Sequence, residues 1–406
     1  MKKWLIQHHE VALTSLVLFM VCITRISMAM GNIAYVLIVL LALVTAYIMR
    51  NQIVISPMIK TYAKAYTLMV LCMIPSIFGS DNILDSIKSF LNIWVWKSFL
   101  FFIILLFIKR KNLLYLMLTV FLYYVGFDSL VAYAYSMLGI ETNGFGRSGG
   151  LFNGSVMGMA MVLTAVFPVA LVVLWDKNFP KSLRIAAGFS TLAMIFGMLG
   201  NQSRGSWIFN MGTSLLVSIR YFMKNILYLG IFLAIVIGLG VTVSQNDHYV
   251  NRFKSVTNTT TNGSNLGRIY VWDSTIDMIE HHPVIGVGPG EWRKVYRAQY
   301  KLPEETQDLN HSHNNFLHIG AESGLLGLIA FVIFGLYVIG ISVHRWIQNN
   351  NPYDLAVAIG FFSYIFLFGS IDYTWNNSSG IRILWFILAI FLQLGYANRV
   401  NENVRG

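Results

Sequence analysis

The sequence predicts an all-α protein that crosses a membrane many times. The chain has 406 residues, of which 56% are hydrophobic and 12% are charged, and its mean hydropathy is +0.61. A soluble globular domain carries about twice this charged fraction, near 25%. Apolar stretches of about 20 residues, the length that a helix needs to cross the hydrocarbon core, recur along the chain. These observations indicate about twelve transmembrane helices.

The predicted spans divide the chain into three parts. A transmembrane bundle of nine spans occupies residues 1–244, a long loop or lid occupies 245–321, and residues 322–406 hold spans ten to twelve and the C-terminal tail. Lys2 and Lys3 precede the first span without a cleavage site after it, so we expect this span to remain as an anchor. The twelve spans are expected at 11–30, 33–49, 62–79, 93–109, 113–137, 154–175, 183–200, 206–222, 225–244, 322–343, 354–372 and 381–397.

Basic residues are concentrated in alternate connections between these spans. Cytoplasmic connections of membrane proteins carry an excess of lysine and arginine. If the N-terminus is cytoplasmic, the connections on that side hold Arg50, Lys60, Lys64, Lys109, Arg110, Lys111, Lys177, Lys181, Arg184, Arg220, Lys224, His344, Arg345, Arg399 and Arg405. Both termini are therefore expected in the cytoplasm, and the long loop on the opposite side. The basic residues behind the net charge of +11 are scattered among the connections between spans and do not form one patch. We therefore expect no nucleic-acid partner.

The long loop contains one clear helical pattern. Acidic residues recur at i, i+4 and i+7 between Gly267 and His282, and Trp272, Ile276 and Ile279 follow the same spacing on a neighbouring face. Pro283 ends the predicted helix, and Gly286–Gly290 predicts a turn. The backbone amides of this turn suit either a phosphate ligand or a purely structural role. The loop is expected to form a lid over the outer face of the bundle.

Six arginines lie on the outer side, against the trend that the spans otherwise follow: Arg147, Arg204, Arg252, Arg268, Arg293 and Arg297. Arginine stays charged and binds phosphate with two parallel hydrogen bonds. Arg268 is expected in the first turn of the loop helix, where the helix dipole also favours anions. For Arg293 and Arg297, contact with lipid headgroups is the better explanation. The cluster indicates an anionic ligand at the membrane surface, such as a lipid pyrophosphate.

Three histidines and a glutamate lie where the loop enters the tenth span: His311, His313, His318 and Glu322. A positioned histidine is suited to act as general base on a hydroxyl nucleophile. A polar cap on a membrane helix explains any one of these histidines as well. His311 and His313 alternate, which is tolerable metal-ligand spacing, but neither a cysteine nor a paired carboxylate completes a coordination shell. We therefore expect no metal.

The pattern His313-Asn314, nine residues, and Gly324-Leu325-Leu326-Gly327-Leu328 resembles the signature of the bacterial lipopolysaccharide O-antigen ligase family. This family lies within a superfamily that also contains O-antigen polymerases. The span layout, the single long outer loop, the short turn with Arg204 and the Gly267-Arg268 helix match the same pattern.

This resemblance implies a cofactor-free glycosyltransferase of the GT-C type in the bacterial inner membrane, with its active site on the periplasmic face. The donor would be a glycan on undecaprenyl pyrophosphate, and the acceptor a sugar hydroxyl of lipid A–core, which completes lipopolysaccharide. The implied partners are these two substrates and membrane lipids. By motif, His313 matches the catalytic base, Arg204 and Arg268 match the pyrophosphate-binding arginines, and Arg147 matches more loosely. Asn314, Gly324 and Gly327 would support the site. His311 is a further supporting residue that the motif does not cover, and its role is open.

Two alternatives remain open. An O-antigen polymerase of the same superfamily would use another lipid-linked glycan as its acceptor. A transporter or flippase of lipid-linked glycans would also suit twelve spans. Against a transporter, the two halves lack matching spans broken by glycine or proline, and the charged residues gather at one face of the bundle.

Overall fold

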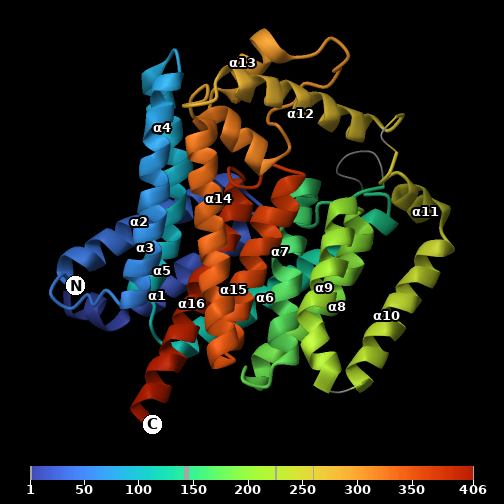
Figure 1. Ribbon diagram of the computed structural model, residues 1–406. Coiled ribbons are helices and arrows are strands. Elements are labelled where there is room, and N and C mark those ends of the chain that lie inside the picture. Colours follow the sequence, from blue (N-terminus) through green and yellow to red (C-terminus); the bar gives the residue numbers. More distant parts are fainter. Residues whose placement is uncertain (1, 141–145, 225, 259, 406) are drawn as a thin grey trace.

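A computed structural model describes residues 2–140, 146–224, 226–258 and 260–405. The protein is all-α, with 80% of its residues in helices and no strand among the residues described. The long helices stand side by side in a bundle, and α12 and α13 lie across one end of it (Figure 1). Residues 141–145, between the predicted spans 113–137 and 154–175, lie outside the described residues.

The helices have the following bounds: α1 Lys2–Ile23, α2 Met28–Ile48, α3 Pro57–Met73, η1 Ile74–Gly79, α4 Ile83–Phe90, η2 Leu91–Val95, η3 Trp96–Ser98, α5 Phe99–Phe107, α6 Lys111–Met137, η4 Leu151–Asn153, α7 Val156–Trp175, α8 Lys181–Asn201, α9 Arg204–Lys224, α10 Ile226–Ser244, α11 Asp247–Lys254, α12 Gly263–His281, α13 Trp292–Val295, η5 Tyr296–Tyr300, α14 Asn315–Asn349, α15 Pro352–Phe361, η6 Phe362–Leu367, η7 Phe368–Ser370 and α16 Ser378–Arg405.

Ten segments of the described chain are long and apolar enough to cross a membrane. They are α1, α2, α3 with η1, α4 to α5, α6, α7, α8, α14, α15 to η7, and α16. The prediction of a multi-pass membrane protein is confirmed. Helices α9 and α10 coincide with the predicted spans 206–222 and 225–244, but they are not among the ten. The count of twelve stays a prediction.

Several predicted boundaries were wrong because polar residues cap the helices elsewhere. Helix α2 begins at Met28, since the side chain of Ser27 accepts a hydrogen bond from the Met30 amide. Arg25 consequently lies in a turn between α1 and α2 and not inside the predicted first span. Helix α14 begins at Asn315 and not at 322, because Asn314 accepts hydrogen bonds from the amides of Phe316 and Leu317.

Helix α12 also begins earlier than predicted, at Gly263 and not at Gly267. Asn262 caps it by accepting a hydrogen bond from the Asn265 amide. Arg268 therefore lies beyond the first turn. The expectation that the unpaired amides of that turn would favour an anion at Arg268 was wrong.

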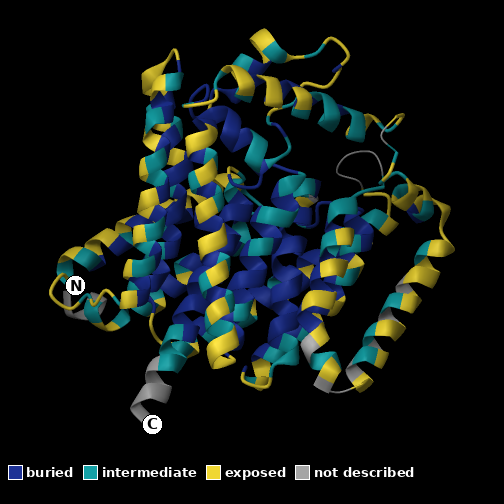
Figure 2. Ribbon diagram, in the orientation of Figure 1, coloured by how far each residue is buried: buried dark blue, intermediate teal, exposed yellow. Residues whose placement is uncertain are grey.

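The core of the bundle is centred on α7, α15 and α16, which are the most buried of the long helices (Figure 2). Helix α2 exposes many apolar side chains on its outer face, as a lipid-facing helix does. The long loop has a small core of its own, formed by Val271, Met278, Val287, Trp292, Tyr296 and Ala321. Because Ala321 belongs to α14, this core joins the loop to the start of that helix.

Candidate functional site

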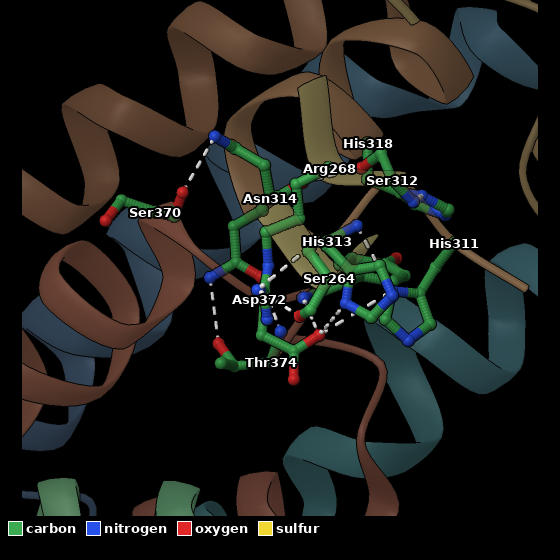
Figure 3. A network of polar contacts seen from close by, with 12 residues as sticks. Ser264, Arg268, His311, Ser312, His313, Asn314, His318, Ser370, Asp372 and Thr374 are labelled. Atoms are coloured by element: carbon green, nitrogen blue, oxygen red, sulfur yellow. Dashed lines mark hydrogen bonds and ion pairs between the residues drawn. The ribbon is translucent and has the colours of Figure 1, made fainter. Parts of the chain in front are cut away.

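His313 and Asp372 form a hydrogen-bonded pair at the outer end of the bundle. The Nδ1–H of His313 donates to Asp372 Oδ1 at 3.1 Å. Asp372 is 1% exposed and lies just beyond η7, in the connection that leads to α16. Figure 3 shows the two side chains facing each other from their separate segments. Because Nδ1 carries the proton that bonds to Asp372, the lone pair of the neutral ring is on Nε2. This nitrogen is directed away from Asp372.

Asn314 and Asn315 hold the two segments of this pair together. Asn314 caps α14 and also donates from Nδ2 to the carbonyl of Ser370 at 3.0 Å. Asn315 Oδ1 accepts from the amides of Thr374 and Trp375 at 2.8 and 3.2 Å, and its Nδ2 donates to Thr374 Oγ1 at 2.8 Å. Both asparagines therefore brace the 371–377 connection against the start of α14, with Asp372 directed at His313.

Burial acts to raise the pKa of Asp372, but the hydrogen bond from His313 and the nearby positive charges, including Arg268, hold it below its ordinary value. The carboxyl group is therefore ionised at neutral pH. A buried carboxylate of this kind can stabilise an imidazolium when His313 takes up a proton.

His311 has a different hydrogen-bonding role from His313. Its Nδ1 accepts a hydrogen bond from the backbone amide of His313 at 3.2 Å. An Nδ1 that accepts cannot also donate to Asp372, whose Oδ1 lies 3.6 Å away. Burial, and then the charge of His313, lower the pKa of His311 from 6.5 to about 3. His311 is consequently a neutral ring that supports the backbone of His313.

The backbone of His313 is itself constrained, with φ at 51°, in the left-handed region. Few residues other than glycine adopt this conformation, and it costs on the order of 1–3 kcal/mol unless the surroundings impose it. Here the hydrogen bond to His311 and the cap at Asn314 impose it. Such strain is concentrated at functional positions, which agrees with a role for this residue.

His318 belongs to a structural network. Its Nδ1 accepts from the Ser312 amide at 3.4 Å, its Nε2 faces Glu322 Oε1 at 3.3 Å, and its ring stacks on Tyr373 with centroids 3.7 Å apart. Glu322 Oε1 also accepts from the Gly290 amide at 2.9 Å. The amides of Val287 and Gly288 donate to the carbonyls of Ala321 and Glu322. The Gly286–Gly290 turn thus uses its amides to fasten the loop to α14.

Gly324 and Gly327, the two glycines of the motif, lie just after this network. Gly324 has φ at 65° and breaks the helical geometry of α14. A Cβ at this position would clash with the backbone of Val284 and Ile285. At Gly327, a Cβ would meet the side chain of Ser323. Gly324 therefore allows the loop backbone to cross α14 at close range beside the histidines.

Four arginines line one cavity beside the His313–Asp372 pair. The cavity has a volume of about 310 Å³, and Arg147, Arg204, Arg252 and Arg268 line it with eleven other residues, none of them acidic. Arg204 donates to the Ser255 carbonyl at 2.5 Å and to Asn265 Oδ1 at 2.7 Å. The sequence predicted Arg147, Arg204 and Arg268 as ligand-binding residues, and the structure brings all three to this cavity.

The other arginines of the cavity are also bound only to neutral oxygen atoms. Arg147 Nε donates to the Asn201 carbonyl at 3.0 Å, Arg252 Nε to the Gln202 carbonyl at 3.1 Å, and Arg268 Nη1 to Ser264 Oγ at 3.1 Å. Arg268 Nε is buried without a partner. Burial, followed by the charges of Arg252, Arg204 and Arg268, lowers the pKa of Arg147 to about 10. Asp372 offsets part of the charge of Arg268, but the cavity keeps a net positive charge that favours an anion with several oxygen acceptors.

The cavity lies next to the His313–Asp372 pair. Ile371, the residue before Asp372, lines the cavity. Arg268 acts electrostatically on both Asp372 and His311, and Figure 3 shows Arg268 and Ser264 beside the histidines. An anion bound by the arginines would therefore have its attached groups close to His313. By contrast, Arg293 and Arg297 pair with the exposed Asp308 and do not line the cavity.

Sequence reasoning missed a buried ion pair that holds the Arg147 loop. Arg25 Nε lies 2.9 Å from Asp128 Oδ2, and its Nη2 donates to the Gly149 carbonyl at 2.6 Å. Asp128 Oδ1 accepts from the Leu151 amide at 2.8 Å. Both charges lie within predicted apolar spans, where an ionisable residue signals a function or a partner. That signal was present in the sequence for Asp128 and Arg25.

A metal-ligand set was not expected, but three potential ligand atoms, one each from His311, His313 and Asp372, lie within 4.8 Å of one another. One carboxylate, that of Asp372, therefore lies with the two histidines, which the sequence did not indicate. In this structure the Nδ1 atoms of both rings are engaged in hydrogen bonds within the protein. His311 Nδ1 is occupied by the His313 amide, and His313 Nδ1 by Asp372. The positive charge of Arg268 also opposes a divalent cation nearby.

Comparison with known proteins agrees with the site. Residues 189–332 match the family model described as O-Antigen ligase. The matched region includes Arg204, Arg268, His313, Gly324 and Gly327, and it ends before Asp372. No curated protein matches the chain. The family match confirms the resemblance to the O-antigen ligase family, a membrane family of glycosyltransferase-like ligases and polymerases.

Proposed function

We propose that this protein is an O-antigen ligase, which transfers a glycan from undecaprenyl pyrophosphate to a sugar hydroxyl of lipid A–core. The observation that carries the proposal is the position of the His313–Asp372 pair beside a cavity that is lined by four arginines and, among the residues described, by no acidic residue. A base and a pyrophosphate-binding site next to each other are what glycosyl transfer from a lipid pyrophosphate requires.

The donor would place its pyrophosphate between Arg204 and Arg268. These residues come from the start of α9 and from α12, on two sides of the cavity. The prenyl chain of the donor would remain in the bilayer, and its glycan would extend outward under the loop. Arg147 and Arg252 would add positive charge around the same group. The excess of basic residues in the opposite connections supports a periplasmic position for this cavity.

His313 would act as the general base. As the acceptor oxygen attacks the anomeric carbon, its proton passes to His313 Nε2, while Nδ1–H stays bonded to Asp372 Oδ1. The bond between the anomeric carbon and the pyrophosphate oxygen breaks, and its electron pair leaves with undecaprenyl pyrophosphate. A single displacement of this kind inverts the anomeric configuration.

The arginines would stabilise the leaving group. Negative charge on the pyrophosphate increases as the glycosidic bond breaks, and preorganised cations are most effective where charge develops. Four guanidinium groups without acidic partners supply this positive charge. Asp372 would stabilise the imidazolium that forms at the same time.

The proposal is tested with purified protein, an undecaprenyl-pyrophosphate glycan and one acceptor at a time. A ligase joins the glycan to lipid A–core in detergent, where no gradient exists. Elongation of a second lipid-linked glycan, with lipid A–core left unmodified, would identify a polymerase instead. Movement of the donor across proteoliposomes without a new glycosidic bond would identify a transporter.

A further inference from the structure

Two further buried cations lie outside the arginine cavity. Lys97 in η3 and Arg382 in α16 are each 4% exposed. Neither forms an ion pair with a carboxylate among the residues described. Segment η3 packs against α16, and Arg382 lies close enough to Lys97 for the two charges to interact. Buried charges without counterions are costly and usually mark a function.

The partners of both cations are neutral. Lys97 Nζ donates to the Asn376 carbonyl at 2.7 Å and to the Asn376 side chain. Arg382 Nη2 donates to Asn32 Oδ1 at 2.6 Å, and its guanidinium carbon lies 4.8 Å from the centre of the Tyr35 ring. Arg382 Nε and Nη1 are buried without any hydrogen-bond partner. A guanidinium cannot lose its charge, so two donors of a cation remain unsatisfied.

These cations lie just beneath the surface. Asn32 and Asn376, the side chains that cover Arg382 and Lys97, are both exposed. Asn32 is in the first turns of α2, a helix whose outer face is strongly apolar and exposed. Arg382 is in the first turns of α16, at the end of the bundle that carries His313. A group entering from the lipid beside α2 needs to displace only amide oxygens to reach both cations.

The chain is also irregular at this point. The run from α4 to α5 is interrupted by the π-helical segment η2, Leu91–Val95, and by the 3-10 segment η3, which carries Lys97. Such interruptions within membrane helices are frequent at functional sites. They place Lys97 against Asn376, in the connection that also carries Asp372.

We infer that Lys97 and Arg382 form a second anion site, which takes the phosphate group of a lipid that enters beside α2. Once Asn32 Oδ1 is displaced, Nε and Nη2 of Arg382, which share one edge of the guanidinium, offer the paired donors that match two phosphate oxygens. Lys97 adds a second positive charge. The apolar outer face of α2 is the surface along which the acyl chains would lie. The site is separate from the cavity of Arg204 and Arg268 and does not depend on the proposed transfer.

The test measures binding of phosphatidic acid to the purified full-length protein by native mass spectrometry. Diacylglycerol, which has the same chains without the phosphate, and inorganic phosphate are the reference ligands. Wild-type protein is expected to bind phosphatidic acid and not diacylglycerol. Arg382→Gln should weaken this binding by about tenfold to a hundredfold, the value of hydrogen bonds to a charged group. Arg110→Gln, which removes an exposed arginine near Glu10, should leave it unchanged.

Equal binding of phosphatidic acid by wild type and Arg382→Gln would overturn the inference. If inorganic phosphate competes as strongly as the lipid, the site binds a free anion, and the assignment of a lipid ligand is overturned. If Arg382→Gln does not fold, the inference is tested by a structure of the wild-type protein alone. Cryo-electron microscopy in nanodiscs with phosphatidic acid should then place a phosphate within hydrogen-bond distance of Arg382 Nε, and an empty position there would contradict the inference.

Discussion

Replacing Asp372 with asparagine removes the negative charge beside His313 and keeps the shape of the side chain. In the native protein, Asp372 Oδ1 accepts from His313 Nδ1 at 3.1 Å and from the Tyr373 amide at 2.8 Å. An asparagine Oδ1 can accept the same two hydrogen bonds, so the orientation of the ring should survive. The variant therefore isolates the stabilisation of the imidazolium by charge.

The size of the effect follows from this geometry. Two unit charges about 4 Å apart interact by about 4 kcal/mol at an effective dielectric constant of about 20. The side chain of His313 is 21% exposed, so water screens part of this interaction. Since each 1.36 kcal/mol changes the rate about tenfold, we expect Asp372→Asn to lower kcat by about 10²–10³.

The assay is steady-state transfer of a labelled glycan in detergent, with donor and acceptor concentrations varied. The KM for the donor should stay close to the wild-type value, because the arginine cavity is intact. Asp277→Asn is the matched control, since it disrupts an exposed aspartate–histidine pair with His281, 3.2 Å apart, on the loop helix. A kcat for Asp372→Asn within about threefold of wild type would refute the charge argument, as would a loss confined to the KM of the donor.

Three further predictions concern the arginines, the second histidine and metals. Arg204→Lys keeps the charge but not the paired donors, so it should raise the KM for the donor and reduce protection from thermal unfolding by pyrophosphate; unchanged values would remove this residue from the site. The pKa of His311 is about 3 in the folded protein and 6.5 for a free side chain. As the pH falls below 6.5, the unfolded state therefore takes up a proton that the folded state does not, and the folded state becomes less stable. Thermal unfolding at pH 7 and pH 4 should therefore show that wild type loses more stability on acidification than His311→Asn, and equal losses would argue against a neutral ring at this position. Chelation with EDTA should leave the transfer rate unchanged, whereas a loss restored by a divalent cation would assign His311, His313 and Asp372 to a metal.

The sequence predicted the helices well because each depends on local composition. Every predicted span overlaps helical segments, and capping by Ser27, Asn262 and Asn314 accounts for the displaced starts of α2, α12 and α14. The span predicted at 93–109 instead begins at Ile83 and is interrupted by η2 and η3. Caps are short-range hydrogen bonds that hydropathy does not register. The same limit explains the displaced start of α12.

The site could be predicted only in part. Arg147, Arg204 and Arg268 were identifiable because basic residues are unusual on the outer side. Asp372 was not, because it lies 59 residues beyond His313 and meets it through the long-range contacts of Asn314 and Asn315. No periodicity in the sequence encodes such a contact. The choice between His311 and His313 likewise required the hydrogen bonds of their ring nitrogens.

The most direct test of the central proposal is the rate of transfer by His313→Ala. Purified wild type and variant are given the undecaprenyl-pyrophosphate glycan and lipid A–core in detergent, without a gradient. Wild type should form the new glycosidic bond with inverted anomeric configuration, and His313→Ala should be slower by about 10²–10⁴, the usual contribution of a positioned base. Transfer by His313→Ala at a rate near that of wild type would contradict the assignment of His313 as the base.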